Sequence, residues 1–259
     1  MTTIPFFQVD AFATAPFTGN PAAVMPLERW LDNRVLQSIA AENNLAETAF
    51  TVASDGDEMD YELRWFTPTV EVNLCGHATL ASAHVLMSGP SIRFATRSGI
   101  LTVSREDDLL ALDMPASVVE PAELPELTRA LGVTGETLSS SRGNGNAIIL
   151  LPDEAAVRAV KPDFAVLAKL PFLVSVTAPG DEQDVVSRVF AAYHGIPEDP
   201  VTGSAHTALT PFWAKRLGRD QFTALQASAR SGILNCRNAG ARVILGGRCT
   251  TVIVGNFQL

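Results

Sequence analysis

The feature that most constrains the fold of this sequence is a series of landmarks in its first half that recurs, in the same order, in its second half. Each series has a Gly-Asn turn before a short apolar run, an Arg-x-Phe triplet, and a glycine that opens an apolar stretch. The offsets lie between 124 and 127 residues, close to half of the 259-residue chain. This ordered set predicts two copies of one α/β unit. The paired positions are Asn20 and Asn146, Pro26 and Pro152, Phe66 and Phe190, and Gly76 and Gly203.

Local patterns agree with a duplicated unit built from strands and a few helices. Asp32 is a candidate N-cap for a helix that runs to about Glu42 with apolar residues on one face. Helices that begin at Gly76 and Gly203 have little polar surface, so we expect them inside their domains. Strand-like runs are Ile4–Val9, Ala22–Met25, Thr48–Val52, Tyr61–Phe66, Arg93–Thr96, Leu101–Ser104 and Leu109–Asp113.

These patterns predict an α+β fold of two pseudo-symmetric domains, each a curved, barrel-like sheet of mixed or antiparallel strands wrapped around a central helix. With 259 residues, 47% of them hydrophobic, the chain is long enough for two such cores. The segment from Pro115 to Pro125 contains three prolines and is the natural boundary. We expect the first repeat over residues 1–114, with the C-terminal strand a candidate to complete it, and the second over residues 115–259.

Charge and cysteine content argue against several classes of protein. The net charge of −9 and the scattered arginines disfavour nucleic acid and membrane lipid as partners. Residues 1–7 do not resemble a signal peptide, and no apolar run reaches the roughly 20 residues of a membrane span. Cys75, Cys236 and Cys249 form no Cys-x-x-Cys pair, which argues against a disulfide framework or a structural zinc site. We expect a soluble, cytoplasmic protein without a structural metal site.

The two glycine-opened helices are the first place to look for chemistry. A helix N-terminus presents unpaired N–H groups and the positive end of the helix dipole, so it suits a small carboxylate. If the duplication places both openings face to face, such a ligand lies between the domains. Cys75 precedes the first opening, where a thiol can serve as nucleophile or base. Thr202 holds the matching position and cannot act as a base, which excludes a proton shuttle built from two thiols.

Titratable residues near these openings are candidate catalytic groups. Glu47 is a lone carboxylate between a helix end and an apolar strand, surroundings that suit general acid–base catalysis. Asp199 comes shortly before the second opening, and His77 is at the start of the first helix. His84 lies in mid-helix and is interpreted as a core histidine, and His206 is a weaker candidate. From position alone, each of these residues also has a purely structural explanation. The carboxylates can be solvated surface groups, the glycines can form tight turns before the helices, and Cys75 can be a small buried side chain.

Five stretches together resemble the phenazine-biosynthesis PhzF-like family, which shares its fold with diaminopimelate epimerase and proline racemase. They follow the family's order from the N-terminus to about residue 210, and a turn at residues 230–232 fits its C-terminal pattern weakly. The stretches are residues 7–12 (FQVDAF), 17–22 (FTGNPA), 45–50 (LAETAF), 74–79 (LCGHAT) and 195–205 (GIPEDPVTGSA).

The resemblance implies a cofactor-independent isomerase that moves a proton within a small carboxylate-bearing substrate bound between the two domains. In the phenazine enzyme, one glutamate moves a proton on a dihydro-hydroxyanthranilate ring, and that glutamate matches Glu47. The resemblance thus assigns acid–base catalysis to Glu47, with Asp199 and His77 as further catalytic residues. Family members commonly form homodimers, which is the expectation here. Substrate contacts are expected from Asn20, Cys75, Gly76, Gly203, Ser204 and Ala205.

Two other functions stay open at this point. The racemase relatives use two cysteines at the paired helix openings, and this chain keeps only Cys75. A racemase or epimerase of amino or hydroxy acids would therefore need another group as its second base. The third hypothesis is a non-catalytic, ligand-binding protein that has kept the cleft. The intact set of Glu47, His77, Asp199 and Ser204 argues against it.

Overall fold

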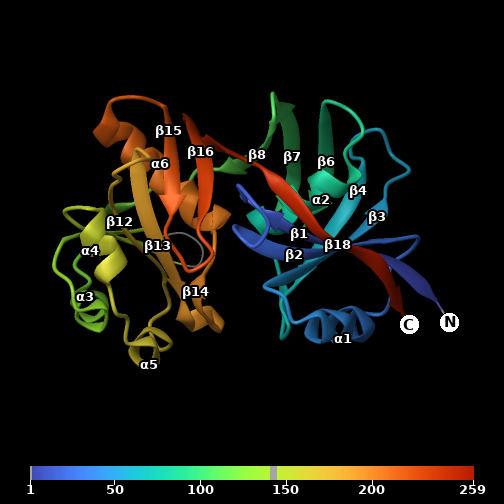
Figure 1. Cartoon of the computed structure of the whole chain (residues 1–259), viewed down its shortest axis with the longest axis horizontal. Coiled ribbons are helices and arrows are strands. Elements are labelled where there is room, and N and C mark those ends of the chain that lie inside the picture. Colours follow the sequence, from blue (N-terminus) through green and yellow to red (C-terminus); the bar gives the residue numbers. More distant parts are fainter. Residues whose placement is uncertain (1, 141–144) are drawn as a thin grey trace. The chain divides into compact units, whose positions relative to one another are not determined.

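The computed structural model describes residues 2–140 and 145–259, and it divides into two compact units (Figure 1). The first unit comprises residues 1–113 and 246–259, and the second comprises residues 114–245. The C-terminal residues therefore group with the first unit.

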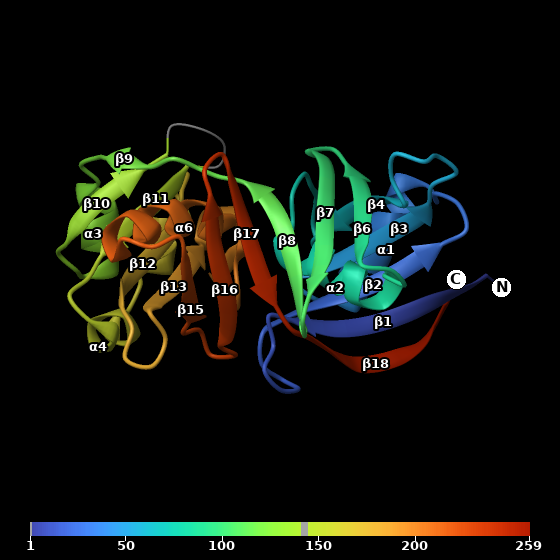
Figure 2. The same ribbon diagram turned by 90° about the horizontal axis from the view of Figure 1, so that it is seen from above.

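The first unit is built on a mixed sheet with the strand order β18–β1–β2–β3–β4–β6–β7–β8. The pairs β2–β3 and β4–β6 are parallel and the other pairs of this series are antiparallel. The short β5 pairs with β4, and β18 runs beside β1 (Figure 2). The strands are β1 (Thr3–Ala11), β2 (Asn20–Leu27), β3 (Glu47–Ala53), β4 (Tyr61–Phe66), β5 (Glu71–Val72), β6 (Ser91–Thr96), β7 (Gly99–Glu106), β8 (Leu109–Pro115) and β18 (Cys249–Gln258).

Helix α1 (Asn33–Asn43) begins where the sequence predicted it. The carboxylate of Asp32 accepts the N–H of Arg34 at 2.8 Å, which satisfies one of the free donors of the first turn. Leu36 and Ile39 lie one turn apart on the helix, and their side chains are buried in a cluster with residues of the sheet. The predicted cap and apolar face are both confirmed.

Helix α2 (Gly76–Leu86) is buried on every side along its first eight residues, as its apolar sequence predicted. It packs against β1, β2 and β3. The strands thus enclose a central helix, and they place its N-terminus next to the starts of β2 and β3.

The second unit repeats the pairing pattern of the first. Its strands follow the order β9–β10–β11–β12–β13–β15–β16, with β14 on β13 and with β11–β12 and β13–β15 parallel. Each parallel pair holds the same place in the series as its counterpart in the first unit. The expected α+β class with mixed sheets around central helices is confirmed. The strands are β9 (Glu120–Pro121), β10 (Glu136–Ser139), β11 (Asn146–Leu150), β12 (Leu173–Pro179), β13 (Val185–Ala191), β14 (Ile196–Asp199), β15 (Gln221–Gln226), β16 (Gly232–Ala239) and β17 (Arg242–Gly247).

Helix α6 (Gly203–Leu217) is the buried helix of the second unit and contains Pro211 in its interior. Proline has no N–H, so the carbonyl of Thr207, four residues earlier, loses its helical partner. The N–H of Ser117 donates to that carbonyl at 3.0 Å instead. The segment that follows β8 is thereby held on the helix.

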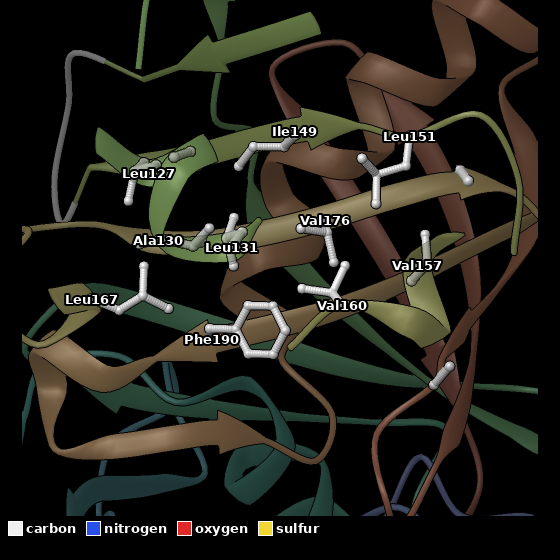
Figure 3. Packing of buried hydrophobic residues seen from close by; sticks show 14 of the residues in the cluster. Leu127, Ala130, Leu131, Ile149, Leu151, Val157, Val160, Leu167, Val176 and Phe190 are labelled. Atoms are coloured by element: carbon white, nitrogen blue, oxygen red, sulfur yellow. The ribbon is translucent and has the colours of Figure 1, made fainter. Parts of the chain in front are cut away.

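A separate hydrophobic cluster covers part of the sheet of the second unit (Figure 3). Leu127 and Leu131 from a short helix pack with Val176 and Phe190 of the strands. The short helices of this unit were not predicted, because one or two turns give too little periodicity to recognise. They are α3 (Pro125–Leu131), α4 (Glu154–Ala159), α5 (Phe164–Leu167) and the 3₁₀ turn η1 (Ala192–His194).

Across the described ranges 2–140 and 145–259, no helix is both long and apolar enough to cross a membrane.

Candidate active site

The first unit brings a carboxylate and an imidazole together from elements far apart in the sequence. Glu47 is the first residue of β3 and pairs with Ala22 of the parallel strand β2. His77 lies in the first turn of α2, which packs against both of these strands. As a result, Glu47 Oε2 lies 3.0 Å from His77 Nε2.

Both side chains of this pair are enclosed by protein: Glu47 is 8% exposed and His77 is 4% exposed. The separation is that of an ion pair, yet within the described residues neither Glu47 Oε2 nor His77 Nε2 makes a well-directed hydrogen bond. Buried polar atoms are nearly always hydrogen-bonded in native proteins, and exceptions mark candidate catalytic groups. The pair is therefore a candidate for proton transfer.

The other ring nitrogen of His77 faces two more side chains. Asn20 Nδ2 lies 3.2 Å from His77 Nδ1, and Cys75 Sγ lies 3.6 Å from the same atom. Asn20 is the first residue of β2 and has no exposed surface. Glu47, His77, Cys75 and Asn20 thus form one buried polar group at the start of α2, here named the Glu47 cluster.

Burial and charge act in opposite directions on the titration of this cluster. Burial disfavours the imidazolium, but the negative charges that Cys75 and Glu47 can carry outweigh it and hold the pKa of His77 well above its ordinary value. Burial and the nearby Glu47 carboxylate raise the pKa of the Cys75 thiol. A negative charge on either side chain thus favours a proton on His77.

Glutamate, cysteine and histidine are also ligand types for a metal ion, and the ligand atoms of Glu47, Cys75 and His77 lie within 4.8 Å of one another. The thiol, however, approaches Nδ1 of His77 and the carboxylate approaches Nε2, at opposite edges of the ring. One ion can bind only one of these nitrogens. The arrangement therefore fits a proton relay better than a shared metal ion.

Both buried helices open without a side-chain cap. Cys75 and Thr202 hold the N-cap positions of α2 and α6 in extended backbone conformations, and neither side chain makes a capping hydrogen bond. The N–H groups of the first turns, which begin at Gly76 and Gly203, thus keep the positive end of each helix dipole. Openings of this kind favour a carboxylate ligand.

In the second unit, Asp199 ends β14 and is connected to the N-cap of α6. Thr202 donates its hydroxyl to Asp199 Oδ2 at 2.5 Å and its backbone N–H to Gln226 Oε1 at 2.8 Å. The amide of Gln226 donates to the Asp199 carbonyl at 2.7 Å. Since Gln226 has no exposed surface, this network fixes the position of Asp199 relative to the helix.

The first turn of α6 repeats a bond found in α2. In α6, His206 Nδ1 lies 2.8 Å from the carbonyl oxygen of Thr202, four residues earlier in the chain. In α2, Thr79 Oγ1 donates to the carbonyl of Cys75, also four residues earlier, at 2.5 Å. Because a carbonyl only accepts, His206 Nδ1 carries hydrogen. Burial lowers the pKa of His206 to about 4, so this histidine is neutral at pH 7.

The residues singled out in the sequence fall into two sets, one within each unit. The sequence analysis missed Gln226. The one sequence feature that could have indicated a buried polar role is its position as an amide at the end of the short alternating strand Gln221–Gln226. In the first unit the set is Asn20, Glu47, Cys75, Gly76 and His77, and in the second it is Asp199, Gly203, Ser204 and Ala205, with Ser204 partly exposed.

A mixed sheet around a buried helix, in each of two similarly connected units, with a buried glutamate–histidine pair at one helix start, places the chain in the class of the epimerase-type fold. A model of the phenazine biosynthesis-like protein family (PhzC-PhzF) matches residues 9–255. The chain belongs to this family, which confirms the resemblance seen in its motifs.

Individual relatives agree with this assignment. A Pseudomonas aeruginosa protein described as an uncharacterised isomerase is 51% identical over 264 residues, which cover 99% of each chain. A PhzF-family crystal structure from Enterococcus faecalis is 43% identical with a TM-score of 0.93 and full coverage of both chains. A hydroxyproline epimerase from Agrobacterium vitis shares the fold alone, with 12% identity, a TM-score of 0.61, and coverage of 98% of this chain and 92% of the epimerase. The expectation of an isomerase-type enzyme is confirmed.

Proposed function

We propose that this protein is a cofactor-independent isomerase that moves a proton within a small carboxylate-bearing substrate, with Glu47 as general acid and base. The observation that carries the proposal is the buried Glu47 carboxylate 3.0 Å from His77 Nε2. A carboxylate in this setting can take a proton from one carbon and return it to another, while His77 balances the changing charge. The family and its isomerase relatives support the same class of reaction.

The uncapped first turn of α2 is the proposed anchor for the substrate carboxylate, because its N–H groups and dipole favour an anion. Gly76 leaves the backbone of this turn free of side-chain atoms. Asp199 is a further proposed catalytic residue. Gly203, Ser204 and Ala205, in the first turn of α6, are proposed as additional substrate contacts.

The alternative of a racemase that uses Cys75 as a base has less support. A thiol acts as a base through its thiolate, and burial together with Glu47 raises the pKa of Cys75. Within the Glu47 cluster, the carboxylate is therefore the better base.

Exchange of substrate protons for deuterium, followed by NMR, tests the role of Glu47. The wild type should exchange one carbon-bound proton of one compound in a panel of cyclic and acyclic amino- and hydroxy-carboxylates. Glu47→Gln removes the proton acceptor while keeping the size of the side chain, so the rate should fall by about 10²- to 10⁴-fold.

Glu42→Gln is the matched control, since Glu42 is exposed on α1 of the same unit and should keep wild-type exchange. Wild-type exchange in Glu47→Gln would contradict the proposal. Should the wild type exchange nothing in the panel, a thermal-shift screen of the same compounds separates a protein that binds them from one whose substrate lies outside the panel.

A further inference from the structure

The Arg-x-Phe triplet that recurs in the two halves of the sequence builds the same arrangement in both units. Arg64 and Phe66 lie two residues apart on β4, and Arg188 and Phe190 lie two residues apart on β13. Side chains with this spacing share one face of a sheet. Each guanidinium lies over the ring of its phenylalanine, with its carbon 5.2 Å from the ring centre in the first unit and 5.1 Å in the second.

The arginine of each triplet also binds a glutamate on the neighbouring short strand. Arg64 donates to both carboxylate oxygens of Glu71 on β5, at 2.7 and 2.9 Å. Arg188 donates to both carboxylate oxygens of Glu198 on β14, at 2.8 Å each. The four side chains are between 13% and 22% exposed. A pair with two parallel hydrogen bonds fixes the direction as well as the distance between its partners.

Both glutamates hold the same place relative to a buried helix. Glu71 is five residues before Gly76, where α2 begins. Glu198 is five residues before Gly203, where α6 begins. The recurrence of this distance in both units indicates that the arginine–glutamate pair positions the segment that leads into the helix. In the second unit, the residue directly after the glutamate is Asp199.

The short strand β14 is weakly defined by its backbone pairing. It pairs with β13 through Ala191 and Ile196 and through Val189 and Asp199, with a shift of register between the two pairs. Such a shift interrupts the ladder of hydrogen bonds and bends the strand. Successive side chains of a strand point to opposite faces, so a contact that fixes Glu198 on one face also fixes Asp199 on the other.

Arg188 is anchored on its other side by the end of α4. Its Nη1 atom donates to the carbonyl oxygens of Val160 at 2.8 Å, Arg158 at 3.3 Å and Val157 at 3.4 Å. These are carbonyls of a helix end, which have no partner within the helix. The guanidinium is thus held by the helix end and by the phenylalanine ring as well as by Glu198. An arginine that is fixed in this way can set the position of its partner.

We propose that Arg188 and Glu198 are positioning residues of the reaction, which hold β14 so that Asp199 is directed at the N-terminus of α6. This inference rests on the proposed catalytic role of Asp199. The influence of the pair passes through Asp199, whose carboxylate accepts a hydrogen bond from the hydroxyl of Thr202, the N-cap of α6, at 2.5 Å. Without the pair, β14 and Asp199 lose their fixed direction.

Glu198→Gln tests this positioning without substrate. Glutamine keeps the size of the side chain but offers one accepting oxygen, so the two-bond pair is lost while Arg188 keeps its bonds to α4. The ¹H–¹⁵N signal of Thr202 is the probe, since this N–H donates to the buried Gln226 at 2.8 Å beside Asp199. The signal should shift in Glu198→Gln, and hydrogen exchange at this N–H should become faster by about tenfold or more.

Glu136→Gln is the matched control. Arg216 donates to both oxygens of Glu136, at 2.7 and 2.6 Å, and its guanidinium carbon lies 3.8 Å from the ring centre of Phe212. The same three residue types thus form similar contacts in the same unit, but Arg216 lies in the last turn of α6, away from the start of the helix. This variant should leave the Thr202 signal and the rate of proton exchange unchanged.

The rate of proton exchange tests whether the pair acts through Asp199. On the compound that the wild type exchanges, Glu198→Gln should lower the rate by about 10- to 100-fold, as a small misplacement of a catalytic group does. In a chain that already carries Asp199→Asn, Glu198→Gln should lower the rate no further. A merely structural role would lower the rate by the same factor in both backgrounds. Arg188→Lys keeps the charge but not the two-bond geometry, and should behave like Glu198→Gln.

An unchanged Thr202 signal in both Glu198→Gln and Arg188→Lys, or an equal loss of rate in the two backgrounds, would overturn the proposal. The Thr202 signal needs no substrate, so it separates this inference from the function of the site. Wild-type exchange in Asp199→Asn together with a shifted Thr202 signal in Glu198→Gln would refute the catalytic role of Asp199 and leave the positioning of β14 by the pair.

Discussion

His206 makes the second unit sensitive to acid. It is 1% exposed and burial lowers its pKa to about 4, whereas an unfolded histidine titrates near pH 6.5. The unfolded chain therefore binds a proton that the folded chain rejects, and stability present above pH 6.5 is lost as the pH falls towards 4. The loss at pH 4 should be about 3 kcal/mol. Chemical denaturation of wild type and His206→Gln between pH 4 and pH 7 measures it.

The glutamine variant keeps a side-chain donor that can reach the Thr202 carbonyl and has no titratable group. Its free energy of unfolding should decline less steeply with acid than that of the wild type. Equal slopes in the two proteins would show that His206 does not take up the proton on unfolding.

Single residues also mark how far the sequence could predict the site. Glu47 and His77 stand in short motifs, and their types indicated acid–base chemistry before any contact was visible. The contacts of Asn20 and Gln226 could not be predicted, because the local sequence around an amide residue in a strand does not indicate which distant residue it contacts. His77 Nδ1 is 57 positions from Asn20 and meets it only because the strands enclose α2.

The cap of α1 is a stabilising feature at the scale of one element. Asp32 accepts the N–H of Arg34 at 2.8 Å, and its negative charge lies at the positive end of the helix dipole. Asp32→Ala should lower the free energy of unfolding by about 1 kcal/mol. Asp32→Asn keeps an accepting oxygen and should lose less. Urea denaturation of the three proteins measures the difference, and equal stability of wild type and Asp32→Ala would show that the cap contributes nothing.

Elements differed in how well their patterns predicted them. The helices that begin at Gly76 and Gly203 could be predicted. An apolar run that follows a glycine and is longer than two helical turns is compatible with few structures other than a buried helix. The four-residue α5 (Phe164–Leu167) completes a single turn, and its stability comes from Leu167 packed in the hydrophobic cluster of Figure 3. Such tertiary contacts have no signature in the local sequence.

At the scale of the whole molecule, the C-terminal strand completes the first unit. β18 pairs with β1 from Thr3 to Ala11, with one shift of register, and lies beside it in Figure 2. A chain that ends at Arg248 lacks every one of these pairs. It should lose hydrogen-exchange protection in β1 and β2 while β12 and β13 of the second unit keep theirs, because their pairing is untouched.

A chain that ends at Gln258 is the control, since it keeps all the β1–β18 pairs and loses only the backbone bonds between Thr2 and Leu259. It should show wild-type protection. Full protection of β1 in the chain that ends at Arg248 would show that the first unit is stable without its last strand.

The place of β18 also sets an order of events during synthesis. The second unit is continuous from residue 114 to residue 245, so all of its residues have been made while the ribosome still holds the chain that follows. The first unit is begun earlier but needs residues 246–259, which are translated after the whole of the second unit. Until then the outer edge of β1 stays open as a template for other strands, a known hazard for aggregation. The half that is made first is the half that is finished last.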